Sequence, residues 1–457
     1  MSWNSAFAGV MTAIMMFFLA VNSFQALLLM FAIPELWSHW QLSDDEYFQA
    51  LVGTEALPPI SVVATLHNPE RNAADLAHML LDLQYPRHEV VLVTDAADGR
   101  ALALLTAEFE LYQVPPAFTV NLRTKPVRAY YRSQTHPRLL CIDKEAGGNG
   151  DAINTGLNAS RYPHALAVAQ DIVFEPDALL RLTRPFLLDR SVVAVGGTLR
   201  PANGSYLENG RLVSGRVQGW ALGCQTIEYM RNFLFQRLGW NRIASNLIFP
   251  GNTVLFKREH VFAVGGFDPD ISIPAVDLDI RLHRHLTEKG VNPRMPVIPD
   301  QIAWANVPED IAGVARARRS WQRGLLRSLR DTSPIFGNPE FGAFGMLAIP
   351  YFWIAIVIAP VIELIGYAGL VVGAATGILD SPFVVAYLAA VVGYGMLLSV
   401  WTVILEGLTF QRASRPQELA RLVFFAVVES LGYRQLVAWY RASAYFLDRP
   451  QTARENG

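Results

Sequence analysis

Three long segments without charged side chains constrain this chain more than any other feature of its sequence. Met1 to Pro34 and Ser381 to Leu405 contain no Asp, Glu, Lys or Arg, and Phe341 to Leu379 contains only Glu363. A helix needs about 20 consecutive apolar residues to cross the hydrocarbon core of a bilayer. All three segments meet this length, so the sequence predicts an integral membrane protein.

The first segment is predicted to remain attached as a membrane anchor. A secretory signal peptide has a basic start, a shorter apolar run and a cleavage site of small residues. Residues 1–33 show none of these features. We therefore assign residues 1–34 to an uncleaved N-terminal transmembrane anchor.

Composition excludes some classes of partner. Hydrophobic residues make up 52% of the 457 residues and charged residues only 17%, below the roughly 25% charged residues of soluble domains. The formal net charge of −2 gives no global field that would attract nucleic acid. Cys141 and Cys224 show no metal-ligand spacing, and we expect both to be reduced and buried.

Residues 57–335 have the pattern of a soluble α/β domain inserted between the first and second apolar segments. Ile60 to Asn68 (ISVVATLHN) and His88 to Gly99 (HEVVLVTDAADG) are Val-rich runs that end in polar residues. The segment between them has the apolar spacing of a helix, which predicts two parallel strands joined by a crossover helix. Asn68, Asp95 and Asp171 each follow such a strand, so we expect them on one rim of the sheet, where ligands bind.

Basic residues predict the orientation in the membrane. Six arginines precede the second apolar segment and three follow the third, whereas the loop GILDSP between them has none. The positive-inside rule then places the large domain in the cytosol and the N-terminus outside. We assign 341–447 to a C-terminal membrane region with two spans, and 448–457 to a polar tail.

Two features of that membrane region have more than one interpretation. Leu422 to Leu447 is interrupted by Glu429, Arg434 and Arg441, which favours an interfacial or re-entrant amphipathic helix over a fourth simple span. Glu363 is costly inside a membrane unless it faces protein or water. It is either part of a helix–helix contact or a carboxylate that lines a pore.

Three stretches together carry a resemblance to a known family. They are KEAGGNGDAINTGLNASRYPHALAVAQDIVFEPDALLRL, then LFKREHVFAVGGFDPD followed by VDLDIRLHRHL, and finally RRSWQRGLLRSL. In order and spacing they resemble family-two membrane glycosyltransferases of the cellulose-synthase-like, polysaccharide-type group. The resemblance implies a GT-A fold with a mainly parallel sheet and an inverting transfer from a nucleoside-diphosphate sugar, with UDP as the expected nucleotide.

The family also implies the reacting groups. Asp171 matches the second aspartate of a paired metal-binding motif, whose first position is Ala169 here, and would hold Mg²⁺ or Mn²⁺. Asp277 matches the catalytic base, with Val276 in place of its acidic neighbour. Asp279 is expected on the surface. The alternative roles are a strand-end turn for Asp171 and a helix-dipole charge for Asp277.

The remaining predicted site residues divide between the donor and the acceptor. Those assigned to the nucleotide and its phosphates are Asn68, Glu70, Asp95, Asn149, Asp151, Arg318 and Arg323. Those assigned to the acceptor are Gln225, Glu228 and Trp321, the last being either a stacking platform for a sugar or an interfacial anchor. Asn149 stands where the family has a lysine, and Ala317 and Ser320 replace the Gln and Arg that normally accompany the Trp. Asn154 would hold the loop or the donor.

Two hypotheses about function follow. The first is a membrane-integrated enzyme that adds sugar to a glycan or a lipid-linked acceptor at the cytosolic face of a bacterial inner membrane, with coupling to polysaccharide export. The second is a degenerate relative that binds nucleotide or glycan as a partner of an active synthase subunit. Its basis is four departures from the family pattern that remove hydrogen-bond donors or carboxylates from one region, namely Ala169, Asn149, Val276, and Ala317 with Ser320. Membrane lipids are expected partners in either case.

Overall fold

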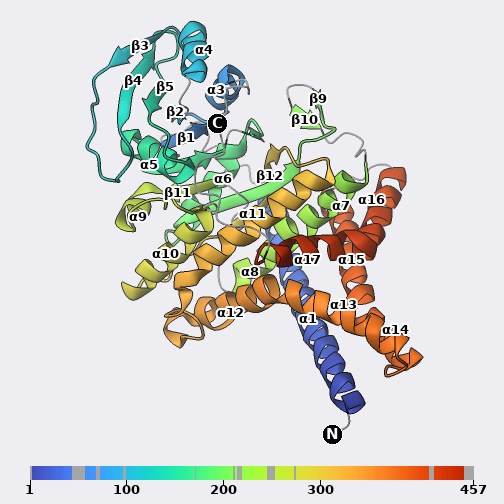
Figure 1. Cartoon of the computed structure of the whole chain (residues 1–457). Coiled ribbons are helices and arrows are strands. Elements are labelled where there is room, and N and C mark those ends of the chain that lie inside the picture. The colour runs from blue at the N-terminus through green and yellow to red at the C-terminus, as the bar shows by residue number, and fades with distance from the viewer. Residues whose placement is uncertain are drawn as a thin grey trace.

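The computed structural model separates a domain of strands and helices from a group of long helices at the other end of the molecule (Figure 1). It describes residues 3–43, 57–67, 73–95, 99–169, 171–208, 211–213, 219–243, 253–271, 274–410 and 416–446. Asn68 and Glu70, two predicted donor-binding residues, lie outside the described residues. Their roles stay predictions.

A ten-stranded sheet forms the centre of the first domain. Its strands, in order across the sheet, are β3 (Leu111–Val114), β4 (Val127–Ser133), β5 (Leu139–Lys144), β2 (His88–Thr94), β1 (Ile60–Leu66), β6 (His164–Val168), β11 (Val254–Lys257), β8 (Ala194–Pro201), β12 (Val297–Ala305) and β7 (Ile172–Phe174). Strands β5, β2, β1 and β6 are parallel to one another, as are β8 and β12, and the other neighbours in this sheet are antiparallel. The α/β class is confirmed, and the sheet is mixed around a parallel core.

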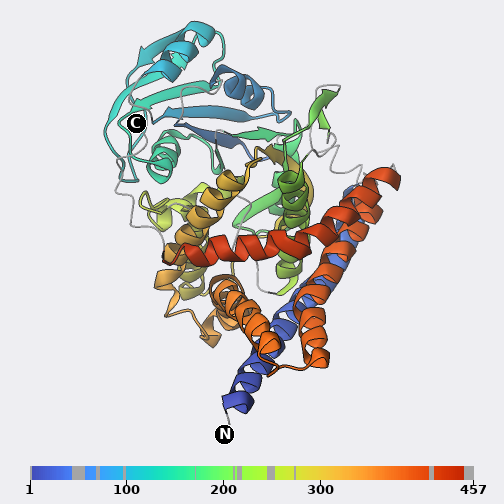
Figure 2. The same ribbon diagram turned by 45° about the vertical axis from the view of Figure 1, so that its right-hand side comes forward.

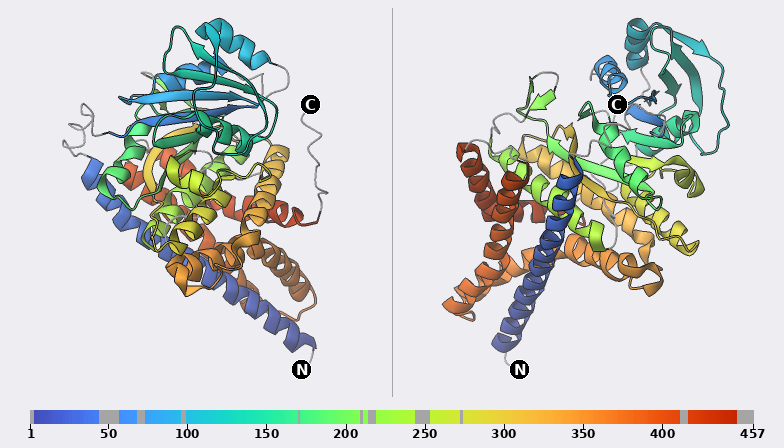
Figure 3. Two further views of the ribbon diagram at one scale, coloured as in Figure 1. Left: turned by 90° about the vertical axis from the view of Figure 1, so that its left-hand side faces the viewer. Right: turned by 180° about the vertical axis from the view of Figure 1, so that it is seen from behind.

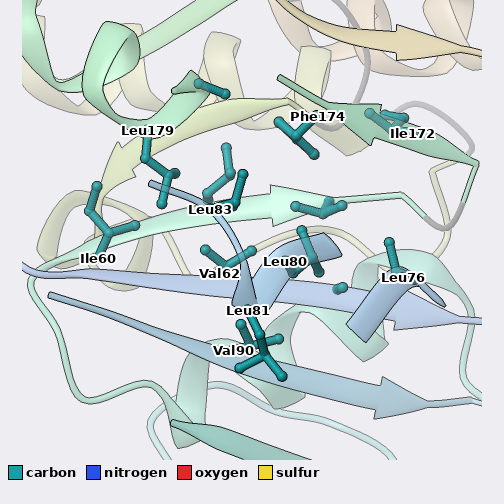
Figure 4. Packing of buried hydrophobic residues seen from close by; sticks show 14 of the residues in the cluster. Ile60, Val62, Leu76, Leu80, Leu81, Leu83, Val90, Ile172, Phe174 and Leu179 are labelled. Atoms are coloured by element: carbon teal, nitrogen blue, oxygen red, sulfur yellow. The ribbon is translucent and has the colours of Figure 1, made fainter. Parts of the chain in front are cut away.

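The predicted strand–helix–strand unit is confirmed. Strands β1 and β2 pair in parallel with Ile60 opposite His88, and every residue of both strands is buried. Helix α3 (Ala73–Leu81) joins them and buries Leu76, Ala77 and Leu80, which share one face because they lie three or four residues apart. Figure 4 shows Leu76 and Leu80 packed over Val62 and the neighbouring strands.

Helices cover both faces of the central strands, and β1 and β2 are accordingly buried on both sides. One face packs against α3, α4 (Arg100–Phe109) and α6 (Ala178–Leu188). The opposite face packs against α5 (Asn149–Ala159), α9 (Arg258–Ala263) and α10 (Pro274–Glu288). Alternate residues of β1 divide accordingly, with Val62 in the first cluster and Val63 in the second. Cys141 and Cys224 are free and buried, as predicted.

Further helices connect the sheet to the long helices. These are α7 (Trp220–Tyr229), the π-helical η1 (Met230–Gln236), α8 (Arg237–Ile243), α11 (Ile311–Leu329), and the short η2 (Arg330–Thr332) and η3 (Pro339–Phe341). Helix α8 packs along α1 (Trp3–Ser43), and α11 packs against α10 and α17 (Arg434–Ser443). A separate two-stranded hairpin is formed by β9 (Tyr206–Glu208) and β10 (Arg211–Val213).

Within the described residues, four helical segments are long and apolar enough to cross a membrane. They are Trp3–Ser38, Phe344–Ala375, Ser381–Leu408 and Gln417–Ser443. The second contains η4 (Phe344–Ala348), α12 (Ile349–Tyr351), η5 (Phe352–Ile358) and α13 (Ala359–Ala375), and the third contains α14 (Ser381–Leu388), η6 (Ala389–Gly393) and most of α15 (Tyr394–Phe410). Figure 3 shows α1 as a long helix that runs from the N-terminus up to the strand-containing domain.

The fourth segment is bent in its middle. It contains α16 (Pro416–Val428), η7 (Glu429–Tyr433) and α17, and the backbone of Leu431 and Gly432 in η7 is not helical. Beyond this bend, α17 runs across the molecule at a steep angle to α16 (Figure 2). By length and composition this segment could span a membrane, so an interfacial or re-entrant position for its second half stays a prediction.

Candidate active site

The parallel strands bring several polar groups to one edge of the sheet. Thr94, the last residue of β2, pairs with Leu66 at the end of β1 and with Asp143 near the end of β5. Asp95, which follows β2, and Lys144, the last residue of β5, therefore lie close together. Because ligands of open α/β sheets bind outside the carboxyl ends of parallel strands, this edge is the expected nucleotide side.

A buried charge cluster lies at that edge. The fully buried Lys144 forms ion pairs with Asp95, at 2.9 Å, and with Asp151, and its Nζ also donates to the Glu145 carbonyl. Burial opposes ionisation, but donors from His67, Lys144 and Gly147 together hold the pKa of Asp95 below its usual range. We missed Lys144 in the sequence, although it is the lysine that precedes the two glycines at 147 and 148.

Asp95 holds the glycine loop that leads into α5. One carboxylate oxygen accepts the Gly147 N–H at 2.8 Å, and the other accepts the Gly148 N–H at 2.9 Å. Gly148 has a φ of +89°, which favours glycine, and a Cβ on Gly147 would collide with the Asp151 carboxylate. With Lys144 and His67 also bound, both oxygens of Asp95 are occupied by donors from the protein. In this structure Asp95 positions the loop, and its contact with uridine stays a prediction.

Two asparagines connect this loop to its surroundings. Asn154 in α5 donates to the Phe267 carbonyl and accepts the Phe267 N–H, both at 2.8 Å, so it ties α5 to the Gly265–Phe267 turn before α10. Asn149, the first residue of α5, accepts a hydrogen bond from the Thr65 hydroxyl at 2.9 Å. Asn149 therefore lies over the end of β1, and Asn154 holds the loop, one of its two predicted roles.

A cavity of about 520 Å³ extends from this sheet edge to the membrane helices. At the sheet edge it is lined by Asn149, Ala169 and Asp171. Its other walls include polar and charged side chains from the connecting helices, namely Glu228, Arg231, Arg237 and Arg318. Candidate spans close it at the far side with Asn22 and Gln25 of α1, Ala355 and Glu363 of the second span, and Arg441 of α17.

The cavity brings together some of the predicted site residues and leaves others out. Its lining includes five of them, namely Asn149, Asp171, Glu228, Arg318 and Trp321. Among the described residues, five further predicted site residues are not part of its lining, namely Asp95, Asp151, Gln225, Asp277 and Arg323. Of the three aspartates assigned to the nucleotide, the metal and the base, namely Asp95, Asp171 and Asp277, only Asp171 is therefore part of the cavity lining.

The predicted base lies in the first turn of α10. Burial raises the pKa of the Asp277 carboxyl above its ordinary value, although the nearby Arg281 acts in the opposite direction. Arg281 donates to Asp277 at 2.7 Å and also to the carbonyls of Val264 and Gly266. Ala275, two residues earlier and therefore on the opposite face of the helix, lines the cavity.

Asp279 was expected on the surface, and that prediction is wrong. The side chain is fully buried, and its charge acts on Arg237 of the cavity wall, where it opposes the lowering of the Arg237 pKa by burial. The reason is helical geometry, because Asp279 lies four residues after Ala275 and shares its inward face. Val276, which replaces the acidic neighbour of Asp277, is buried in an apolar cluster.

On the acceptor side, Glu228 is the best-placed of the predicted residues. It lines the cavity, forms an ion pair with Arg318 and accepts a hydrogen bond from the Tyr433 hydroxyl at 3.2 Å. Gln225, one turn earlier in α7, is buried and donates to the Pro308 carbonyl at 2.7 Å, so in this structure it ties α7 to the segment before α11. Trp321 is half-buried, and the guanidinium of Arg441 lies 4.9 Å from its ring centroid.

Glu363 faces the interior of the protein. It lines the cavity and accepts a hydrogen bond from the Tyr367 hydroxyl at 3.0 Å. Nearby, Arg231 donates to Glu429 at 3.0 Å. These charged groups would be costly against lipid, and their position around a polar cavity removes that cost. Glu363 therefore lines a cavity, and its role in a pore stays a prediction.

The protein offers few ligands for a metal. Among the described residues, no group of three or more His, Cys, Asp or Glu side chains could hold a metal ion. At the sheet edge the exposed Asp171 supplies a carboxylate, whereas Ala169 supplies no ligand atom. Mg²⁺ can be held by one or two carboxylates when substrate phosphates and water complete its coordination. The site therefore fits a metal only in company with a bound diphosphate.

Comparison with known protein families agrees with this architecture. Residues 58–324, more than half of the chain, match the model of the family described as Glycosyltransferase like family 2. The chain therefore belongs to this glycosyltransferase family.

The curated relatives are bacterial synthases. The chain is 22% identical over 317 residues to the poly-beta-1,6-N-acetyl-D-glucosamine synthase of Staphylococcus aureus (strain COL), covering 67% of this chain and 65% of that protein. It is 22% identical over 283 residues to the protein of the same name from Staphylococcus epidermidis, covering 60% of this chain and 57% of that protein. The chain thus spans less than two thirds of the length of each of these relatives.

Two solved structures are similar at low TM-scores. A mannosyltransferase from Pyrobaculum calidifontis, in complex with GDP-Man and Mn²⁺, has a TM-score of 0.49 and 18% identity and covers 89% of this chain and 99% of its own. TarS 1–349 of S. aureus, in complex with UDP, has a TM-score of 0.36 and 12% identity, and the match covers 82% of this chain and 91% of the TarS chain. At these scores neither likeness adds to the family assignment.

Proposed function

We propose that this protein is a membrane-integrated inverting glycosyltransferase that transfers a sugar from a nucleoside-diphosphate sugar to an acceptor held at the membrane. The observation that carries the proposal is the cavity itself. It joins the carboxyl edge of the parallel strands, through Asn149 and Asp171, to candidate membrane spans, through Gln25, Ala355 and Glu363. A donor that enters from the sheet edge and an acceptor that enters between the helices would meet inside it.

The donor half of the cavity suits a diphosphate. Asp171 and the start of α5 lie at its edge, and Arg237 and Arg318 line its wall. Cations and a helix N-terminus stabilise the negative charge that develops on a departing diphosphate. A divalent cation held by Asp171 and the phosphate oxygens would add Lewis-acid stabilisation of the same charge. The name of the curated relatives makes UDP-N-acetylglucosamine the first donor to test.

We propose Asp277 as the general base that accepts the proton of the acceptor hydroxyl. Burial, which raises the pKa of its carboxyl, makes it a stronger base than an exposed aspartate. Its carboxylate must first leave Arg281, to which it is bound here, and reach the acceptor hydroxyl. We expect its release when the donor binds beside the Gly265–Phe267 turn, because the Gly266 carbonyl of this turn also binds Arg281.

A second candidate function has a specific observation in its favour. Asp95 and Asp277 are both bound to protein cations, and Ala169 leaves a single carboxylate for a metal. A protein that binds nucleotide or glycan without turnover, as a partner of an active synthase, would show the same arrangement. The first proposal includes three further points. The sheet domain lies in the cytosol, the membrane is the inner membrane, and sugar transfer is coupled to polysaccharide export.

Release of nucleotide tests the proposal. The full chain, in membrane vesicles of its own host, is incubated with a panel of nucleoside-diphosphate sugars and Mg²⁺ or Mn²⁺. We expect nucleoside diphosphate to be released with at least one donor, and Asp277→Asn to lower the rate about 10²- to 10⁴-fold, the usual share of a positioned base. Binding of a donor without release of nucleotide supports the partner protein instead.

A further inference from the structure

The cavity contains an arginine whose position compensates for a side chain that the chain lacks. Trp321 keeps the aromatic residue of the family-like stretch RRSWQRGLL, but Ser320 stands in place of the arginine before it. Ser320 is exposed on α11. The cation beside Trp321 comes instead from α17, where the guanidinium of Arg441 lies 4.9 Å from the centroid of the indole ring.

Contacts between α11 and α17 hold Arg441 in this place. Arg319 donates to the Ser443 hydroxyl at 2.9 Å and lies over the Tyr440 ring. Gln322, next to Trp321, donates to the Tyr445 hydroxyl at 2.6 Å. These contacts flank Arg441 on both sides along the chain, so α17 is fixed against α11 and the Arg441 side chain lines the cavity.

Arg441 carries a positive charge that no acidic side chain neutralises by direct contact. Among the described residues, none forms an ion pair with it, and its Nε is buried without a hydrogen-bond partner. The carboxylates that act on it, Glu228 and Glu363, are bound to Arg318 and Tyr367 respectively. A partly buried cation with unused donors in a cavity is the arrangement that receives an anion, and a guanidinium matches the geometry of phosphate oxygens.

We propose that Arg441, supported by stacking on Trp321, binds a phosphate group inside the cavity. The proposal rests on the proposed function, because it concerns the same cavity. The phosphate belongs either to the diphosphate of the donor or to a lipid-linked acceptor that enters between the candidate spans. In both cases a helix of the membrane region supplies a phosphate ligand to the glycosyltransferase domain.

Equilibrium binding to the full chain in lipid nanodiscs tests the proposal with two pairs of probes. UDP is compared with uridine, and farnesyl phosphate with farnesol, so that each pair differs in its phosphate. Arg441→Gln should weaken binding of one phosphate probe about 10- to 100-fold, which is the usual contribution of charge-assisted hydrogen bonds to affinity. The affinity for the neutral counterpart of that probe should stay unchanged. If Arg441→Gln loses affinity for UDP, the bound phosphate belongs to the donor. If it loses affinity for farnesyl phosphate, the bound phosphate belongs to a lipid acceptor.

The controls separate phosphate binding from a structural role. Arg441→Lys should recover part of the affinity, and Arg284→Gln, which removes an exposed arginine paired with Glu288, should change nothing. The unfolding midpoint of Arg441→Gln should stay close to that of the parent, because no ion pair is lost.

The proposal would be overturned if Arg441→Gln kept its affinity for both phosphate probes, or if it lost affinity equally for the neutral probes. It would also be overturned if the parent bound neither phosphate probe. None of these measurements needs turnover. Absence of nucleotide release would therefore contradict the proposed function without deciding this proposal.

Discussion

Replacement of Lys144 by methionine should destabilise the sheet domain severely. Lys144 is fully buried between the carboxylates of Asp95 and Asp151, which are almost completely buried as well. Methionine has a similar length but no charge, so the substitution would leave two buried carboxylates facing each other. The Gly147–Gly148 loop, which Asp95 holds, would lose part of its support.

The expected loss in the free energy of unfolding follows from the geometry of the ion pair. At the 2.9 Å that separates Nζ of Lys144 from Asp95, and with an effective dielectric constant of about 20, the Coulomb attraction is roughly 6 kcal/mol. The cost of burying the charges offsets much of this attraction, and removal of one partner of a buried pair typically costs about 3–5 kcal/mol. For a domain of this size, that loss lowers the unfolding midpoint by roughly 6–20 °C.

Thermal unfolding of the full chain in detergent, followed by tryptophan fluorescence, measures the effect. Lys125→Met is the matched control, because the Lys125 side chain is exposed and only its backbone N–H binds Asp151. Addition of Asp151→Asn to Lys144→Met should recover part of the loss, since one of the two facing charges disappears. If Lys144→Met unfolds within 1 °C of the parent, the buried cluster does not stabilise the domain as we argue.

Two further predictions concern the chemistry. Because burial raises the pKa of Asp277 and a base must be deprotonated, the rate of nucleotide release should rise with pH through this raised pKa and be lost below it. The pH–rate profile of Asp277→Asn should lack that limb, and an identical profile would exclude Asp277 as the base. Ala169→Asp places a second carboxylate beside Asp171 on the cavity wall and should tighten Mg²⁺-dependent binding of UDP about tenfold or more, as calorimetry can measure. Equal affinity with and without Mg²⁺ in this variant would mean that the sheet edge does not hold a metal.

Local patterns in the sequence predict the fold better than the site. The parallel pair β1 and β2 could be predicted because Val-rich runs and the spacing of Leu76 and Leu80 are signals within a few residues. The antiparallel strands β11 and β7 depend on contacts between distant segments, which no local period reveals. For the same reason, the mixed sheet could be seen only in the structure.

The site shows the same limit. Motif positions predict that Asp171 and Trp321 reach the cavity, but they do not predict which groups neutralise the other charges. Lys144 binds Asp95 from a neighbouring strand, and Arg441 reaches Trp321 from a different helix. These pairings arise from packing, and a reading of single motifs overlooks them.

A substitution that fills the cavity between the sheet edge and the membrane helices shows whether the reaction takes place there. Ala355 lines the cavity from the second candidate span, whereas its neighbour Ile354 is 41% exposed on the outer surface. We expect Ala355→Trp to abolish nucleotide release from a donor that the parent uses, although UDP still binds, and Ile354→Trp to keep the parent's rate. Nucleotide release by Ala355→Trp at the rate of the parent would mean that the reaction takes place outside this cavity.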